Sequence, residues 1–110
     1  MSRADARHHQ AERLLDRLKS DHGVLKHFRP LDEAQVEVDL AAAHPDAEDW
    51  LLQLALHLHL NSDGYLQALA HGGPRYDLAG NPAGEVEADT RHHARALLKH
   101  HRAHKAKKRG

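Results

Sequence analysis

The chain has 110 residues and no cysteine, which excludes disulfide bonds, thiolate chemistry and cysteine-ligated zinc. Its hydrophobic content of 40% suits one modest core, and no apolar run reaches membrane-spanning length. The N-terminal residues lack the apolar segment of a secretion signal, so a single small domain in the reducing cytoplasm is expected.

Charge is distributed unevenly although the formal net charge is +0. Residues 91–110 hold eight Lys or Arg and no acid, whereas the interval between Arg29 and Arg75 holds eight acids and no Lys or Arg. The basic C-terminal end suggests a polyanionic partner. A solvated, partly disordered tail is the alternative, and charge alone does not distinguish the two.

Helices dominate the predicted elements. Apolar spacing predicts helices over residues 4–19, 32–43, 46–60, 63–70 and from 87 or 89 to about 105. Residues 24–31, between the first two helices, are predicted to form a connector that Phe28 anchors in the core. Alternation in Val36–Leu40 leaves a strand as the alternative there. Ser62 is the candidate N-cap of the 63–70 helix, and residues 105–110 are expected to fray.

Residues 75–86 interrupt the helical pattern. Residues 75–78 can run extended, Ala79-Gly80-Asn81-Pro82 supplies turn chemistry, and residues 83–86 can run back. The pattern predicts a small β-hairpin, and the fold class is therefore mainly α with one hairpin.

Histidine is abundant, at 13 residues, but its spacing does not favour a metal site. His57 and His59 would diverge on a helix, and His100 and His104 lack a third ligand nearby in sequence. Polar surface that gains charge as the pH falls toward about 6.5 is the favoured interpretation, so no metal or cofactor is predicted. No serine lies in a nucleophile pattern, and a non-enzymatic function is expected. The serines are Ser2, Ser20 and Ser62.

The start of the 63–70 helix is a candidate ligand site. Unpaired N–H groups near Asn61, Ser62 and Gly64 suit a phosphate or a terminal hydroxyl, and Tyr65 offers a ring for stacking. An ordinary cap with Tyr65 packed half in the core is the alternative. Asp63 counts against an anion because it adds negative charge to the first turn.

Cations elsewhere provide two further candidates. Arg75 is the single cation between Arg29 and Arg91 and enters the hairpin after a flexible Gly-Gly-Pro; a surface ion pair is its alternative. The last helix carries a basic stripe that can track a phosphate backbone, with simple solvation as the alternative. This stripe comprises Arg91, Arg95, Lys99 and Arg102.

The hairpin segment Arg75–Glu85 resembles the ProQ/FinO family motif Arg-x-Asp-Leu-x-Gly-x-Pro-x-Gly-Glu. Upstream, Ala55-Leu56 and Tyr65-Leu66 match without a gap, and downstream His93-Ala94-Arg95 matches a His-Ala-Arg. Arg29-Pro30-Leu31 is similar to the family's Arg-Pro-Leu. The resemblance covers about residues 10–100.

The resemblance implies a compact helical RNA chaperone domain over residues 10–104, with an extension at 1–9 and a basic tail at 105–110. It implies a monomeric bacterial protein that binds small RNAs and messenger 3′ ends in post-transcriptional regulation. Terminator stem-loops with a 3′ uridine tail are the implied ligands. Tyr65, Arg75 and the Ser62 region, with Arg95, would engage the RNA 3′ end.

Several positions depart from the family pattern. Asp32-Glu33-Ala34-Gln35 stands where a basic-apolar run is usual. Asp49, Gln53 and His57 stand where the central helix carries Lys and Arg, and His57 regains charge only below about pH 6.5. Weaker RNA binding, shifted toward the C-terminal helix, is therefore expected. The alternative is a protein-interaction module that kept the fold and meets a basic partner.

Overall fold

Six helices and one β-hairpin make up the computed structural model, which describes residues 2–109 and side chains through Lys105. The elements are α1 (Arg3–Asp21), α2 (Gly23–Lys26), α3 (Glu33–Ala43), α4 (Asp49–Leu60), α5 (Asp63–His71), β1 (Pro74–Tyr76), β2 (Pro82–Glu85) and α6 (Ala88–Arg109). The predicted class, mainly α with one hairpin, is confirmed.

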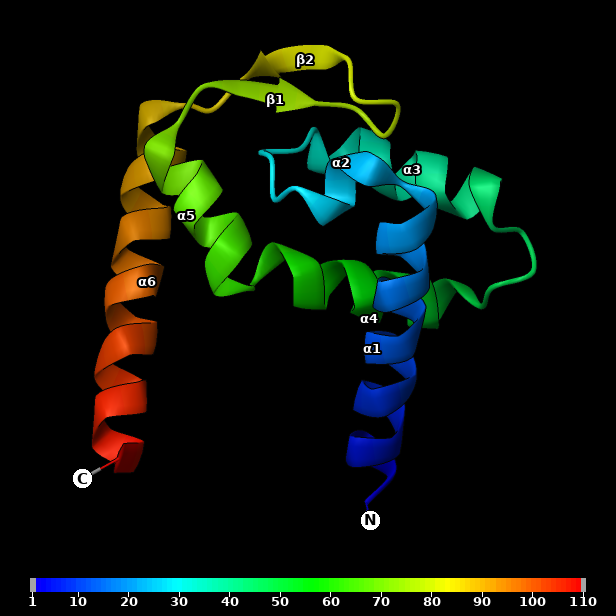
Figure 1. The fold of residues 1–110 in the computed structure, drawn as a ribbon, viewed down its shortest axis with the longest axis horizontal. Coiled ribbons are helices and arrows are strands. Elements are labelled where there is room, and N and C mark those ends of the chain that lie inside the picture. The colour runs from blue at the N-terminus through cyan, green and yellow to red at the C-terminus, as the bar shows by residue number, and fades with distance from the viewer. Residues whose placement is uncertain (1, 110) are drawn as a thin grey trace.

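The helices form an arch (Figure 1). α1 and α6 are its two legs, their free ends point to the same side, and α4 runs across between them. α1 packs on α4, α5 on α6 and α3 on α4, while the hairpin lies across the opposite end from the chain termini. The extents of 42 × 41 × 19 Å show that the arch is only about two helices thick. Both broad faces are therefore open to solvent.

Several predicted boundaries need correction. α1 begins at Arg3 and ends at Asp21, slightly beyond the predicted 4–19, and the predicted connector contains the short helix α2. α4 begins at Asp49, after a turn in which the Ala47 N–H donates to the His44 carbonyl at 3.1 Å. α6 continues to Arg109 where fraying was expected from residue 105; Gly110 lies outside the described residues.

The strand alternative for Val36–Leu40 is wrong, because this segment is helical. Val36 and Leu40, four residues apart, are 0% and 1% exposed, so the helical period buries both. Val38 is 62% exposed on the same helix. Trp50, near the start of α4, is 43% exposed.

The hairpin extends beyond its own two strands. Pro74 pairs with Glu85 and Tyr76 with Pro82, and the turn between them includes Gly80 at φ +89. The Tyr76 N–H donates to the Pro30 carbonyl at 2.8 Å, and the Asp32 N–H donates to the Tyr76 carbonyl at 2.9 Å. Leu31 and Tyr76 thus form a parallel β-bridge, which fixes the start of α3 beside the hairpin although the two segments are far apart in sequence.

A buried histidine lies beneath the loop before α3. The Phe28 ring stacks on His59 with centroids 5.4 Å apart, and the Lys19 Nζ lies 5.0 Å from the centroid of Phe28. His59 is 1% exposed, and neither ring nitrogen has a hydrogen-bond partner within the described part of the chain. Burial, with a smaller contribution from Lys19, lowers the pKa of His59 to about 4.

This burial makes stability depend on pH. Unfolded His59 takes up a proton near pH 6.5, whereas folded His59 does so only near pH 4. The unfolded state therefore binds more protons across this window, and His59 should cost about 3 kcal/mol of stability as the pH falls from 6.5 to 4. Urea unfolding of the wild type and His59→Phe at pH 7, 5.5 and 4.5 measures the difference. Parallel pH profiles for the two proteins would contradict this assignment.

A pair of histidines joins the ends of two helices. His22 and His44 follow the last residues of α1 and α3, and their Nε2 atoms lie 2.9 Å apart. Burial and the proximity of His44 lower the pKa of His22.

Within residues 2–109, no helix combines the length and apolar content needed to cross a bilayer.

Candidate nucleic-acid interface

Tyr65 and Arg75 meet at a third residue, Glu33, at the start of α3. The Tyr65 hydroxyl donates to Glu33 Oε2 at 2.8 Å and accepts the Leu31 N–H at 3.1 Å. Arg75 Nη1 donates to the Leu31 carbonyl at 2.7 Å and lies 3.6 Å from Glu33 Oε2. The parallel bridge of the loop before α3 with Tyr76 brings these groups together.

Tyr65 is 0% exposed, so its ring presents no face for stacking and is buried more fully than the half-packed alternative predicted. Burial, with a contribution from the Glu33 carboxylate, raises the pKa of Tyr65 well above its ordinary value. The phenol therefore stays protonated and keeps donating to Glu33. The structure gives Tyr65 a bracing position between α5, the loop before α3 and Glu33.

Arg75 is only 16% exposed at its side chain, and its ion-pair partner is one of the nearby acids, as its alternative interpretation foresaw. The hollow around it is acidic, since four carboxylates line it with Arg75: Asp32, Glu33, Glu85 and Glu87. A phosphate entering here would meet these carboxylates as well as the guanidinium. Contact between Arg75 and RNA stays a prediction.

The first turn of α5 is capped as predicted. Ser62 Oγ accepts the Tyr65 N–H at 3.3 Å and donates to the His59 carbonyl at 2.7 Å. The Asp63 carboxylate is held by two residues of α6, His101 at 2.9 Å and Lys105 at 2.6 Å. These two hydrogen bonds, Lys105 first, lower the pKa of Asp63. The negative charge that opposed an anion here is thus partly compensated from α6.

The other predicted residues near this turn lie in different surroundings. Asn61 is exposed, and its Nδ2 donates to the His57 carbonyl at 2.9 Å. Gly64 lies under the Phe28 ring, where a Cβ atom would come within 3.0 Å. His57 is exposed on α4 whereas His59 is buried, so the two face different surroundings. Across the described residues, no three His, Asp or Glu side chains gather as metal ligands.

A groove without carboxylates lies between α5, the loop before α3 and the hairpin. It has a volume of about 440 Å³ and combines aromatic, cationic and amide side chains. The guanidinium of Arg29 lies 5.2 Å from the centroid of the Tyr76 ring. The other lining residues are Phe28, Pro30, Gly64, Gln67, Ala68, His71, Gly72 and Pro74.

Sequence reasoning missed this groove apart from Gly64. Phe28 was assigned to the core and Arg29 served only to mark the family motif. Alternating aromatic and cationic residues at Phe28-Arg29 and Arg75-Tyr76 were the available signal. Neither segment by itself predicts the β-bridge between Leu31 and Tyr76 that brings the two together.

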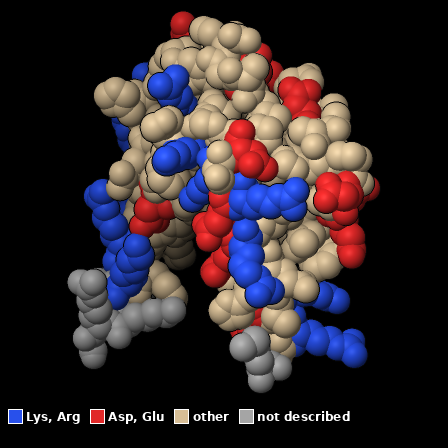
Figure 2. Space-filling view, turned by 45° about the vertical axis from the view of Figure 1, so that its right-hand side comes forward, with Lys and Arg blue, Asp and Glu red and all other residues tan. Residues whose placement is uncertain are grey.

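The basic stripe of α6 begins beside this groove. Arg91 packs against Gly72, which lines the groove, so closely that a Cβ there would lie 2.8 Å from Arg91 Cδ. Arg95 Nη2 donates to the Ala70 carbonyl at 3.4 Å, and Lys99 and Arg102 continue the stripe toward the C-terminus. In Figure 2, Lys and Arg follow both legs of the arch, while Asp and Glu gather on the face to the right and in the hollow between the legs.

This sequence and fold are similar to those of a known class of proteins. The ProQ/FINO family model matches residues 7–110. The chain belongs to the ProQ/FinO family, which confirms the resemblance carried by the Arg75–Glu85 motif. A similar solved structure is that of a FinO-like RNA chaperone from Neisseria meningitidis MC58, with a TM-score of 0.72 and 35% identity. The match covers 77% of this chain and 89% of that one. No curated protein matches the chain.

Proposed function

We propose that this protein is an RNA-binding chaperone whose carboxylate-free groove takes unpaired nucleotides. The observation that carries the proposal is the groove itself, in which Phe28, Tyr76 and Arg29 surround a space free of acids. Aromatic rings and guanidinium planes are the side chains on which unpaired RNA bases stack. Family membership and the FinO-like RNA chaperone with the same fold support the assignment.

The stripe on α6 supplies the phosphate contacts in this proposal. It starts at the end of the groove and runs along α6, so a duplex stem on α6 would place its single-stranded end in the groove. A terminator stem-loop with a 3′ uridine tail has this form. Binding of such messenger and small-RNA 3′ ends, for post-transcriptional regulation, is the specific activity proposed.

Fluorescence anisotropy with a labelled terminator stem-loop tests the proposal. Binding should weaken when the unpaired 3′ tail is removed and should fall steeply with salt, because phosphate contacts release counterions. Equal affinity for the tailed and tailless stem-loops would contradict a groove for unpaired nucleotides. Affinity that does not change with salt would contradict the role of α6.

Glu33→Gln tests whether Arg75 also contacts the RNA. The amide oxygen can still accept from Tyr65, but the negative charge 3.6 Å from Arg75 Nη1 is removed. RNA affinity should rise about fivefold, equivalent to about 1 kcal/mol for a partly exposed charge pair. Glu12→Gln on α1 is the control for the same change in net charge. An equal gain in both variants would show that Arg75 has no direct part.

A further inference from the structure

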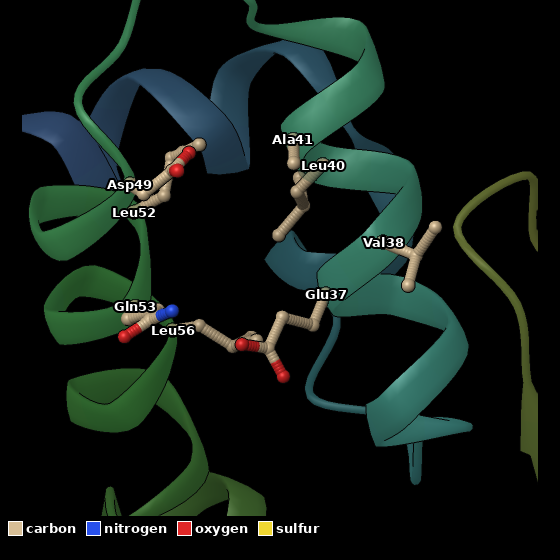
Figure 3. Close-up of a pocket in the computed structure, with 8 residues that line it drawn as sticks. All are labelled: Glu37, Val38, Leu40, Ala41, Asp49, Leu52, Gln53 and Leu56. Atoms are coloured by element: carbon tan, nitrogen blue, oxygen red, sulfur yellow. The ribbon is translucent and has the colours of Figure 1, made fainter.

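A second groove, between α3 and α4, is lined by carboxylates and leucines and has no Lys or Arg in its lining, unlike the first groove. It has a volume of about 260 Å³ and an apolar floor of Leu40, Leu52 and Leu56 (Figure 3). In that view Leu40 points from α3 into the space, and Glu37 reaches across toward Leu56 on α4. The remaining lining residues are Val38, Ala41, Asp49 and Gln53.

The charges on its walls are negative and uncompensated. Glu37 on α3 and Asp49 on α4 are exposed, and neither takes part in any ion pair found among the described side chains. The segment between Arg29 and Arg75 contains no Lys or Arg, so α3 and α4 supply neither of these side chains to neutralise the two acids. An RNA phosphate would be repelled here, whereas a Lys or Arg side chain would be attracted.

Apolar surface accompanies this charge. Val38 lines the groove and is 62% exposed, one of two large hydrophobic residues found exposed in the described part of the chain. The other, Trp50 of α4, lies outside the groove, with the Arg7 guanidinium of α1 5.9 Å from its ring centroid. The volume lies just below the roughly 300–1,000 Å³ typical of small-molecule sites. It suits one or two apolar side chains presented by a partner, in the manner of an amphipathic helix in a groove.

Among the described side chains, neither long helix, α1 or α6, offers an exposed leucine stripe to a second copy; Leu14 and Leu18 of α1 are buried. Through Lys105, the exposed side chains of α6 are basic or small apart from Asp89 in the first turn, and its leucines do not form an exposed apolar stripe, because Leu98 is buried and Leu97 packs against the core. Two copies joined through their α3–α4 faces would bring Glu37 and Asp49 together with their own kind. A helix of one copy therefore lacks the apolar side chains to fill the groove of another, and two α3–α4 faces repel each other through their carboxylates.

We infer that the α3–α4 groove docks a basic amphipathic helix of another protein. The apolar ridge of that helix fills the space above Leu40 and Leu52, and its Lys or Arg side chains pair with Glu37 and Asp49. This site shares no lining residue with the groove proposed for RNA. The two ligands can therefore bind together, and this inference does not depend on RNA binding.

The test is anisotropy of the full chain with a labelled synthetic 18-residue helix that carries leucines along one stripe and lysines and arginines elsewhere. A peptide of the same composition with scrambled leucines is the control. The amphipathic peptide should bind saturably and at least fivefold tighter than the scrambled one. The double variant Glu37→Gln/Asp49→Asn should weaken binding at least fivefold. Absence of saturable binding overturns the inference.

A blocking variant locates the peptide. Ala41→Trp fills the groove from an exposed position on α3 and should abolish binding, whereas Ala42→Trp, which does not line the groove, should retain it. Circular dichroism confirms that both variants fold. Equal binding by both variants overturns the location.

Discussion

Tyr65→Ala is expected to lower the free energy of unfolding by about 3–5 kcal/mol, the usual cost of removing a buried aromatic side chain. Tyr65 is 0% exposed, and its hydroxyl joins the Leu31 N–H to Glu33. The variant removes the packing of this ring in the core, where it lies 5.5 Å from the His59 ring between centroids, and leaves both polar groups without the hydroxyl. Urea denaturation followed by circular dichroism measures the decrease.

Tyr65→Phe separates the hydroxyl from the ring. It keeps the packing and should cost about 1–3 kcal/mol, because the buried Leu31 N–H loses its acceptor. If Tyr65→Ala unfolds like the wild type, the bracing position assigned to Tyr65 is wrong. For RNA assays Tyr65→Phe is the better variant, since weak binding by Tyr65→Ala can arise from loss of folding.

Removing charge from α6 should have the largest effect on RNA binding. The triple variant Arg91→Gln/Arg95→Gln/Lys99→Gln removes three of the four cations in the basic stripe. Affinity for a terminator stem-loop should fall by at least about tenfold, and the slope of log K against log salt should decrease by about 0.7–0.9 for each phosphate that α6 no longer neutralises. Anisotropy titrations at several salt concentrations measure both quantities.

A control on the other leg of the arch isolates position from net charge. Arg3→Gln/Arg13→Gln/Arg17→Gln removes the same charge from α1, away from the groove. It should change the affinity and the salt slope much less. Equal decreases in the two triple variants would show a diffuse electrostatic attraction instead of a defined path along α6.

Local sequence signals predicted an element well where the residues that determine it lie within one short segment. Ser62 caps α5, Gly80 provides the turn, and the motif of Arg75–Glu85 identified the hairpin and the family. The short helix α2 was missed because it has a single turn, too short for a periodic pattern. The start of α4 was misplaced because a turn follows Pro45 before the helix begins.

The site was harder to predict because its contacts join distant segments. Glu33 was recognised as a departure from the family pattern, but not as the partner of both Tyr65 and Arg75. The groove depends on the bridge that brings Arg29 to Tyr76. Such pairings are set by tertiary packing, so no local period or motif in one segment reports them.

The central claim is that unpaired RNA lies in the groove lined by Phe28 and Tyr76, and crosslinking tests it most directly. A terminator stem-loop with 4-thiouridine in its 3′ tail would be bound to the full chain, irradiated and analysed by mass spectrometry. We predict crosslinks to peptides containing Phe28 or Tyr76. Crosslinks confined to peptides that contain Trp50, which is 43% exposed on α4, would contradict the proposed site.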